Sequence, residues 1–179
     1  MFHRHFSAQA VSTTKDSVGF MLRCNETHAW GSYRFDRGLK CMDLVNLLMV
    51  DWDPAAEGSS VDDHYTVKNK KEVLEIINSR VETHLDELWR VYETPSGGIH
   101  AFLMSHKYTP SEGEGVLTEM KGDLLYRDFS LKRNKWAVRV GPKPNRANDF
   151  VARFIGNFGK GIALSDHLKT IKIHDSFLP

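Results

Sequence analysis

Two aspartates separated by one residue stand at the end of an apolar run, in the segment Val50–Pro54 (VDWDP). Side chains alternate along a strand, so Asp51 and Asp53 are expected to project together, with Trp52 on the opposite side. Neighbouring carboxylates repel each other unless a cation or a shared proton relieves the repulsion. Oxygen ligands at this spacing suit Mg²⁺ or Mn²⁺. The alternative is a strand that ends in a polar loop, where acidic residues are common.

A second candidate is the segment TPSGGIH, residues 94–100, which lies between two apolar runs. Its glycines, Gly97 and Gly98, permit close approach of the backbone to an anion. His100 begins the returning strand, and an imidazole can donate a hydrogen bond to a phosphate. The alternative is an ordinary hairpin turn whose histidine packs or is solvated.

Basic residues crowd the segment 126–146 of a chain whose net charge is only +1. This concentration predicts a local positive patch. Arg139 lies between two valines of an apolar run, so its side chain should point away from theirs, and an arginine that faces an acidic metal site suits polyphosphate binding. The alternative is a solvated basic hairpin. The cations are Lys132, Arg133, Lys135, Arg139, Lys143 and Arg146.

The elements expected to position these residues predict an α+β fold, with a mixed or antiparallel central sheet flanked by helices. The run 43–53 has the length and apolarity of a strand buried on both faces in the middle of a sheet. The spacing of apolar residues predicts an amphipathic helix over 70–90. Further strands are expected at 17–22, 31–35, 89–94, 99–104, 123–130 and 136–141, further helices at 149–157 and 165–172, and loops at 54–69 and 108–115.

Length and composition predict a single domain, residues 1–179, in which 1–16 form a loose arm or a first edge strand. A net charge of +1 excludes a global basic field. Cys24 and Cys41 allow one disulfide, but two thiols in a reducing compartment are the expectation. The chain has no apolar run long enough to span a membrane and no signal-peptide pattern, so we expect a soluble intracellular protein, cytoplasmic or nuclear, without a membrane partner.

The order of these elements resembles the catalytic core of the archaeo-eukaryotic primase superfamily, the primase-polymerases, over roughly residues 43–146. The first motif of that family, two acids separated by a hydrophobic residue, is matched by Asp51-Trp52-Asp53. The second, a small residue two positions before a histidine, is matched by Gly98-Ile99-His100. The resemblance implies an RRM-like arrangement of the central sheet.

The third family motif is an aspartate on a later strand, for which Asp128 is the leading match and Asp123 the alternative. The family normally has a hydrophobic residue before this acid, and Arg127 departs from that pattern. The resemblance implies that Asp51, Asp53 and Asp128 hold two divalent metal ions, Mg²⁺ or Mn²⁺. It also implies that His100 contacts the phosphates of the incoming nucleotide. The remaining nucleotide contacts would come from Ser96, Gly97, Gly98, Lys135, Arg139 and Lys143.

The function implied by the resemblance is metal-dependent nucleotidyl transfer, by a DNA primase or a DNA polymerase. Its partners would be a single-stranded or primed DNA template and nucleoside triphosphates. A helicase or another replication protein would be a further partner, because the chain carries no P-loop and no zinc-finger spacing of its own. Two alternatives stay open. One is a catalytically inactive relative that binds single-stranded nucleic acid or a nucleotide as an accessory protein. The other is a metal-dependent nuclease, because acids with basic partners also serve phosphodiester hydrolysis, although His3-Arg4-His5 suits a strand-borne pair of metal ligands poorly.

Overall fold

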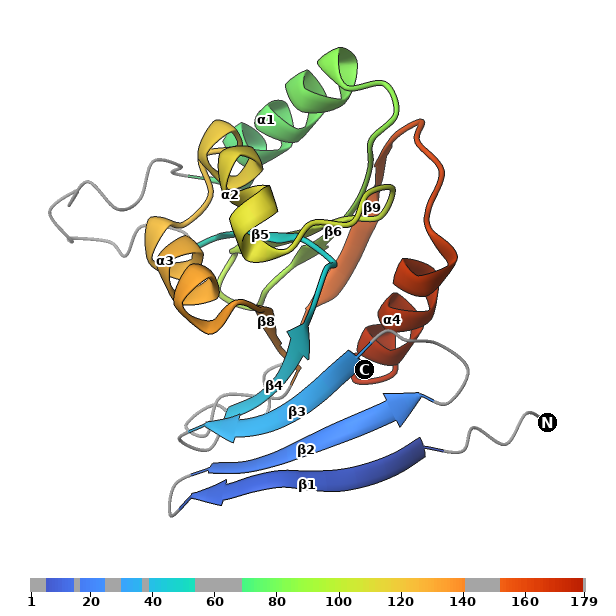
Figure 1. Cartoon of the computed structure of the whole chain (residues 1–179). Coiled ribbons are helices and arrows are strands. Elements are labelled where there is room, and N and C mark those ends of the chain that lie inside the picture. Colours follow the sequence, from blue (N-terminus) through green and yellow to red (C-terminus); the bar gives the residue numbers. More distant parts are fainter. Residues whose placement is uncertain are drawn as a thin grey trace, which may run out of the picture.

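The structure is a computed structural model that describes residues 6–14, 17–24, 30–36, 39–53, 69–140 and 152–178, with side chains from residue 41 onward. These residues form an α+β fold with two antiparallel sheets (Figure 1). The five-stranded sheet has the order β1-β2-β3-β4-β8. Its strands are β1 (Phe6–Thr14), β2 (Ser17–Cys24), β3 (Trp30–Asp36), β4 (Leu39–Leu44) and β8 (Trp136–Arg139).

The four-stranded sheet contains the segments that carry the first two motifs. Its order is β5-β7-β6-β9, and every neighbouring pair is antiparallel. Because β7 is antiparallel to both β5 and β6, those two strands run parallel to each other, and helix α1 makes the crossover between them. The strands are β5 (Met49–Trp52), β6 (Leu88–Glu93), β7 (Ile99–Leu103) and β9 (Arg153–Gly159).

Four helices occur in the described part of the chain: α1 (Lys70–Thr83), α2 (Pro110–Glu119), α3 (Leu124–Arg133) and α4 (Ser165–Asp175). None of them has the length and apolarity needed to cross a membrane. Figure 1 places α4 apart from the other three. The Trp52 indole N–H donates to the Met120 carbonyl at the end of α2, whereas His174 of α4 contacts the rings of Tyr92 and Phe102. Strand alternation therefore puts α2 and α4 on opposite faces of the four-stranded sheet.

A short buried crossover, residues 45–48, carries the chain from one sheet to the other. Leu47 and Leu48 are buried, and the Leu48 carbonyl accepts a hydrogen bond from the Leu103 amide at 3.0 Å. The Asn46 carbonyl accepts another from the Tyr108 amide at 2.9 Å. The prediction of one strand over 43–53 in the middle of a sheet is therefore wrong: the run is divided between β4 and β5, and β5 lies at an edge of its sheet.

Several other predicted elements differ from the structure. The helix predicted over 70–90 ends at Thr83, and the chain then enters β6. The predicted loop 108–115 is largely helix α2, because Thr109 and Glu112 form a capping box with Pro110 in the first turn. The predicted strand 123–130 is helix α3. Of the predicted helix 149–157, residues 153–157 belong instead to strand β9, which pairs with β6, and residues 149–151 lie outside the described residues.

The remaining predicted elements agree with the structure. These are the strands at 17–22 and 31–35, the hairpin of β6 and β7, the strand at 136–141, which begins as β8, the helix at 165–172, and an edge strand within residues 1–16. Most of the predicted loop 54–69 and the basic turn 141–146 lie outside the described residues, as does His3-Arg4-His5.

Candidate functional site

Strands β5 and β7 bring Asp51 and His100 directly opposite each other. The two residues are partners in the strand register, and the Asp51 Oδ1 lies 3.5 Å from the His100 Nε2. Their side chains are 18% and 9% exposed, so the pair is almost enclosed. Trp52 points to the other face and is buried, as the alternation of strand side chains predicts. The first and second sequence motifs therefore meet across two neighbouring strands.

Carboxylates crowd around Asp51. Burial raises the pKa of Asp51 well above its ordinary value, and the negative charges of Asp53 and Asp123 raise it further, while Arg139 opposes them. Within the described part of the chain, the buried Oδ1 of Asp51 has no hydrogen-bond partner. A buried carboxylate oxygen without a donor, close to two other acids, is a position that a cation would stabilise.

His100 is held as a neutral imidazole. Burial lowers the pKa of His100 to about 3, and the charges of His174 and Arg139 act in the same direction. Its Nδ1 is buried and makes no hydrogen bond to any described residue. A neutral imidazole has one N–H to donate and one nitrogen to accept, so it can offer a single hydrogen bond to a phosphate oxygen.

The turn of residues 94–98 lies close to Asp53. The Gly97 amide donates to the Thr94 carbonyl at 2.9 Å, and the Gly98 amide donates to the Thr94 Oγ1 at 3.0 Å. The two glycine N–H groups are thus engaged inside the turn, and so is Ser96, whose hydroxyl lies 3.1 Å from that of Thr94. A Cβ on Gly98 would lie only 3.1 Å from the Asp53 Oδ1. The turn therefore contributes a close backbone surface against Asp53.

Of the two candidates for the third acid, the structure brings Asp123 to the site. The Asp123 amide donates to the Asp51 carbonyl at 2.8 Å, so this carbonyl of the edge strand β5 has a hydrogen-bond donor. Its carboxylate is buried and caps α3 by accepting from the Tyr126 amide at 2.9 Å. Asp128 lies on α3 instead of on a strand, is 51% exposed, and pairs with Arg127 at 3.0 Å. Asp128 therefore projects from a helix surface, while Asp123 joins Asp51 and Asp53.

The basic residues divide between two places. Arg139 on β8 is close enough for its charge to act on both Asp51 and His100, so it belongs to the site. Lys135 is exposed and follows Asn134, the C-cap of α3. Lys143 lies outside the described residues.

Sequence patterns did not indicate His174, a buried histidine that packs against the rings of Tyr92 and Phe102. His174 of α4 is fully buried, with its ring centroid 4.9 Å from that of Tyr92, the register partner of His100. Asp175 accepts hydrogen bonds from the Tyr92 hydroxyl at 2.5 Å and from the Arg90 guanidinium at 2.9 Å. These contacts join residues more than 80 positions apart. A local sequence pattern carries no signal for them.

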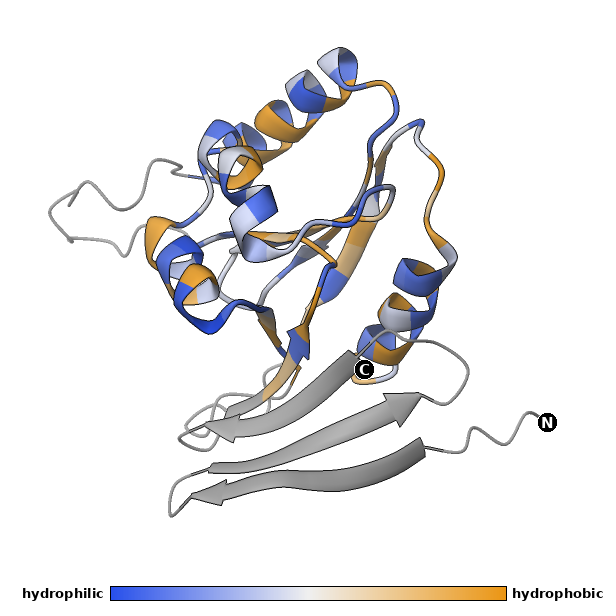
Figure 2. Cartoon of the chain, viewed as in Figure 1, coloured by the Kyte–Doolittle hydropathy of each residue, from blue (hydrophilic) through white to orange (hydrophobic). Residues whose placement is uncertain are grey.

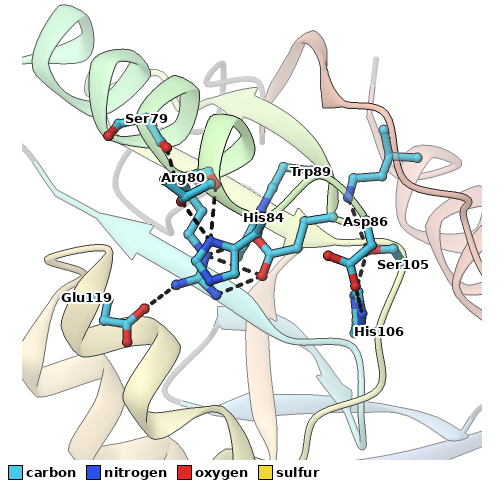
Figure 3. Close-up of polar contacts among 11 residues, drawn as sticks. Ser79, Arg80, His84, Asp86, Trp89, Ser105, His106 and Glu119 are labelled. Atoms are coloured by element: carbon cyan, nitrogen blue, oxygen red, sulfur yellow. Dashed lines mark hydrogen bonds and ion pairs between the residues drawn. The ribbon is translucent and has the colours of Figure 1, made fainter.

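A separate polar cluster joins α1, β6 and α2 on the other side of the sheet (Figure 3). The buried Glu87 accepts from the Arg80 Nη2 at 2.7 Å and from the Trp89 indole at 2.8 Å, and Arg80 also pairs with Glu119. Arg80 and Glu119 line a surface groove of about 470 Å³. The cluster binds two helices to a strand, and its charges are satisfied internally, so we assign it a structural role.

Figure 3 also shows Ser105, His106 and Asp86 in a hydrogen-bonded chain. His106 lies 2.8 Å from the Ser105 hydroxyl through Nδ1 and 3.0 Å from Asp86 through Nε2. The Ser105 hydroxyl also accepts from the Leu88 amide at 3.0 Å, which ties it to the backbone of β6. Asp86 is largely exposed, so solvent competes for its bond to His106. The chain of bonds fastens the end of β7 to the start of β6.

Asp51 and Asp53 offer carboxylate oxygens, the kind of ligand that Mg²⁺ takes in proteins. In the described ranges, no group of three or more histidine, cysteine or acidic side chains is placed so that it could hold a metal ion. Mg²⁺ usually binds through one or two carboxylates and keeps water and phosphate as its other ligands, so Asp51 and Asp53 are sufficient in kind. Comparisons of the chain with family models, curated proteins and solved structures gave no match.

Proposed function

We propose that the chain is a metal-dependent nucleotidyltransferase that extends a nucleic acid on a template, as a DNA primase or a DNA polymerase. The observation that carries the proposal is the nearly buried Asp51 carboxylate, crowded by Asp53 and Asp123, opposite a neutral His100 on the neighbouring strand. Acids that gather at one point favour a cation, and a hydrogen-bond donor beside them favours a phosphate.

Asp51 and Asp53 would hold the divalent cation, Mg²⁺ or Mn²⁺, with Asp123 beside them. When bound, the ion would neutralise phosphate charge and favour ionisation of the attacking 3′-hydroxyl. Asp51 would give up its proton as the ion binds, because the raised pKa reflects burial and neighbouring negative charge. His100 would donate its N–H to a phosphate oxygen, and Arg139 would add positive charge at the same place.

The order of the elements supports the RRM-like part of the proposal. Strand β5, helix α1, strand β6 and strand β7 follow one another as β-α-β-β, with β7 between β5 and β6 in the sheet. These are the first four of the six elements of the β-α-β-β-α-β arrangement. The expected site residues of the first two motifs fall on the two adjacent strands of this unit.

The experiment is incorporation of a labelled nucleotide on primed and unprimed templates, with Mg²⁺ and with Mn²⁺. Asp51→Asn should abolish incorporation, whereas Glu75→Gln, an exposed acid on α1, should leave it unchanged. Asn is close to Asp in size, so loss of activity reports loss of charge. Incorporation that survives Asp51→Asn would refute the proposal, and degradation of the labelled strand without incorporation would point to a nuclease instead.

The second candidate is a catalytically inactive protein that binds single-stranded nucleic acid or a nucleotide. It is favoured by the lack, among the described residues, of a preassembled group of three or more metal ligands. Thermal unfolding separates the two candidates. Stabilisation by Mn²⁺ with a nucleoside triphosphate, lost in Asp53→Asn, supports the enzyme, while stabilisation by an oligonucleotide alone supports the binding protein.

A further inference from the structure

The outer face of α3 exposes two large apolar side chains among cations. Leu125 is 53% exposed and Phe129 is 44% exposed, and their spacing of four residues places them on one side of the helix. The Lys132 Nζ lies 5.9 Å and the Arg133 Cζ 5.3 Å from the centroid of the Phe129 ring. Figure 2 shows hydrophobic and hydrophilic segments alternating along this helix. We call Leu125, Phe129, Lys132 and Arg133 the α3 patch.

Contacts on the inner side of α3 fix which side faces outward. The Tyr126 hydroxyl accepts from the Ala137 amide at 3.3 Å, and the Tyr126 ring stacks on that of Trp136 at a centroid distance of 6.4 Å. Ser130, one turn further, is buried. Because the helix is anchored through these residues, the exposure of Phe129 follows from the packing of the core, and the ring remains available to a partner.

The charge of the α3 patch indicates which class of partner would bind it. The one acid on this face, Asp128, is paired with its neighbour Arg127, so Lys132 and Arg133 give the patch a net positive charge. An exposed aromatic ring flanked by cations matches the two needs of a single-stranded nucleic acid, a surface for base stacking and positive charge for phosphates. A protein or membrane partner would call for a broader apolar area than two separated side chains.

We propose that the α3 patch binds single-stranded nucleic acid, with a base stacked on Phe129 and phosphates beside Lys132 and Arg133. The Asp123 amide bonds to the Asp51 carbonyl, so α3 begins at the candidate site. A helical rise of 1.5 Å per residue puts Phe129 about 9 Å from Asp123 along the axis. The patch would thus hold a template strand close to the acids. This role as a template surface rests on the proposed function, while the binding itself does not.

The test is fluorescence anisotropy with a short labelled oligothymidylate and the full chain, repeated over a range of salt concentrations. Phe129→Ala should weaken binding by about tenfold, because stacking on an aromatic ring is lost, and Phe129→Trp should preserve it. Lys132→Gln should make the plot of log affinity against log salt concentration less steep by about one unit, because one phosphate contact is lost. Leu168→Ala removes an exposed apolar side chain from α4 and should have no effect. Thermal unfolding checks that each variant is folded.

The outcomes separate this proposal from the proposed function. Wild-type affinity in Phe129→Ala, an equal loss in Leu168→Ala, or no oligothymidylate binding by the wild-type chain at low salt would overturn the α3 patch. Nucleotide incorporation that depends on Asp51 but not on Phe129 would overturn the role of the patch as a template surface, and would leave the enzyme proposal intact. Binding that depends on Phe129 in a chain that incorporates no nucleotide would support the patch and refute the enzyme.

Discussion

Replacing Gly98 by alanine is expected to disturb the candidate site through a single added methyl group. A Cβ at this position would lie 2.9 Å from the Trp52 carbonyl oxygen, 3.0 Å from the Thr94 Oγ1 and 3.1 Å from the Asp53 Oδ1. The first contact is with strand backbone, which yields little, so the turn and the strand end must separate. Overpacking of this kind costs about 1–3 kcal/mol of folding free energy. The movement should also displace the Asp53 carboxylate.

The matched control is Gly97→Ala. Gly97 has a φ of +84° and nothing within 4 Å of an added Cβ, so alanine there costs backbone strain of about 1–2 kcal/mol without touching Asp53. Urea unfolding should therefore show two variants of similarly reduced stability. A Mn²⁺ titration followed by calorimetry should separate them, with affinity about tenfold lower in Gly98→Ala and unchanged in Gly97→Ala. Wild-type stability of Gly98→Ala would show that the turn does not lie as close to Asp53 as described. Equal metal affinity in the two variants would remove Asp53 from the cation site.

Three further predictions concern the acids and the buried ion pair. Asp123→Asn should strongly reduce nucleotide incorporation but keep the cap of α3, because asparagine is also a good N-cap. Asp128→Asn should leave incorporation unchanged, and equal losses in the two variants would restore Asp128 to the site. The raised folded-state pKa of Asp51 means that metal-free wild-type protein loses stability as the pH rises from about 4 through that pKa. The stability of Asp51→Asn relative to wild type, measured by urea unfolding, should therefore increase as the pH rises above about 4, and a flat difference would contradict the raised pKa. Arg80→Ala should lower the free energy of unfolding by about 3–5 kcal/mol, because the buried Glu87 loses its ionic partner. A loss below about 1 kcal/mol would show that solvent reaches Glu87.

Features of the site that depend on local pattern were predictable from the sequence. Strand alternation predicted that Asp51 and Trp52 lie on opposite faces, and the turn TPSGGIH predicted a hairpin whose returning strand has His100 near its start. The meeting of the two motifs across β5 and β7 was an implication of the family resemblance, because the pairing joins residues 49 positions apart in the chain. Periodicity within either strand carries no information about which strand is its neighbour.

The third acid and the buried position of His174 could not be found in the same way. The strand predicted over 123–130 is a helix because Asp123 caps it at one end and Asn134, in the left-handed region with φ of +51°, ends it at the other. Reading Asp123 as an N-cap would have predicted both the helix and a polar residue at its start. His174 had no comparable signal, because its burial against Tyr92 depends on how α4 packs on the sheet.

The crossover at residues 45–48 has a consequence for how the protein opens. Its carbonyl groups accept the amides of Leu103 and Tyr108, and its leucines are buried, so the segment is clamped on both sides of the passage between sheets. Amide hydrogens in such a place exchange with solvent only when the surrounding structure unfolds. The amides of Leu103 and Tyr108 should therefore exchange at the slow rate of global unfolding. The two sheets would then behave as one cooperative unit, and the strand that carries Asp51 would share the full stability of the fold.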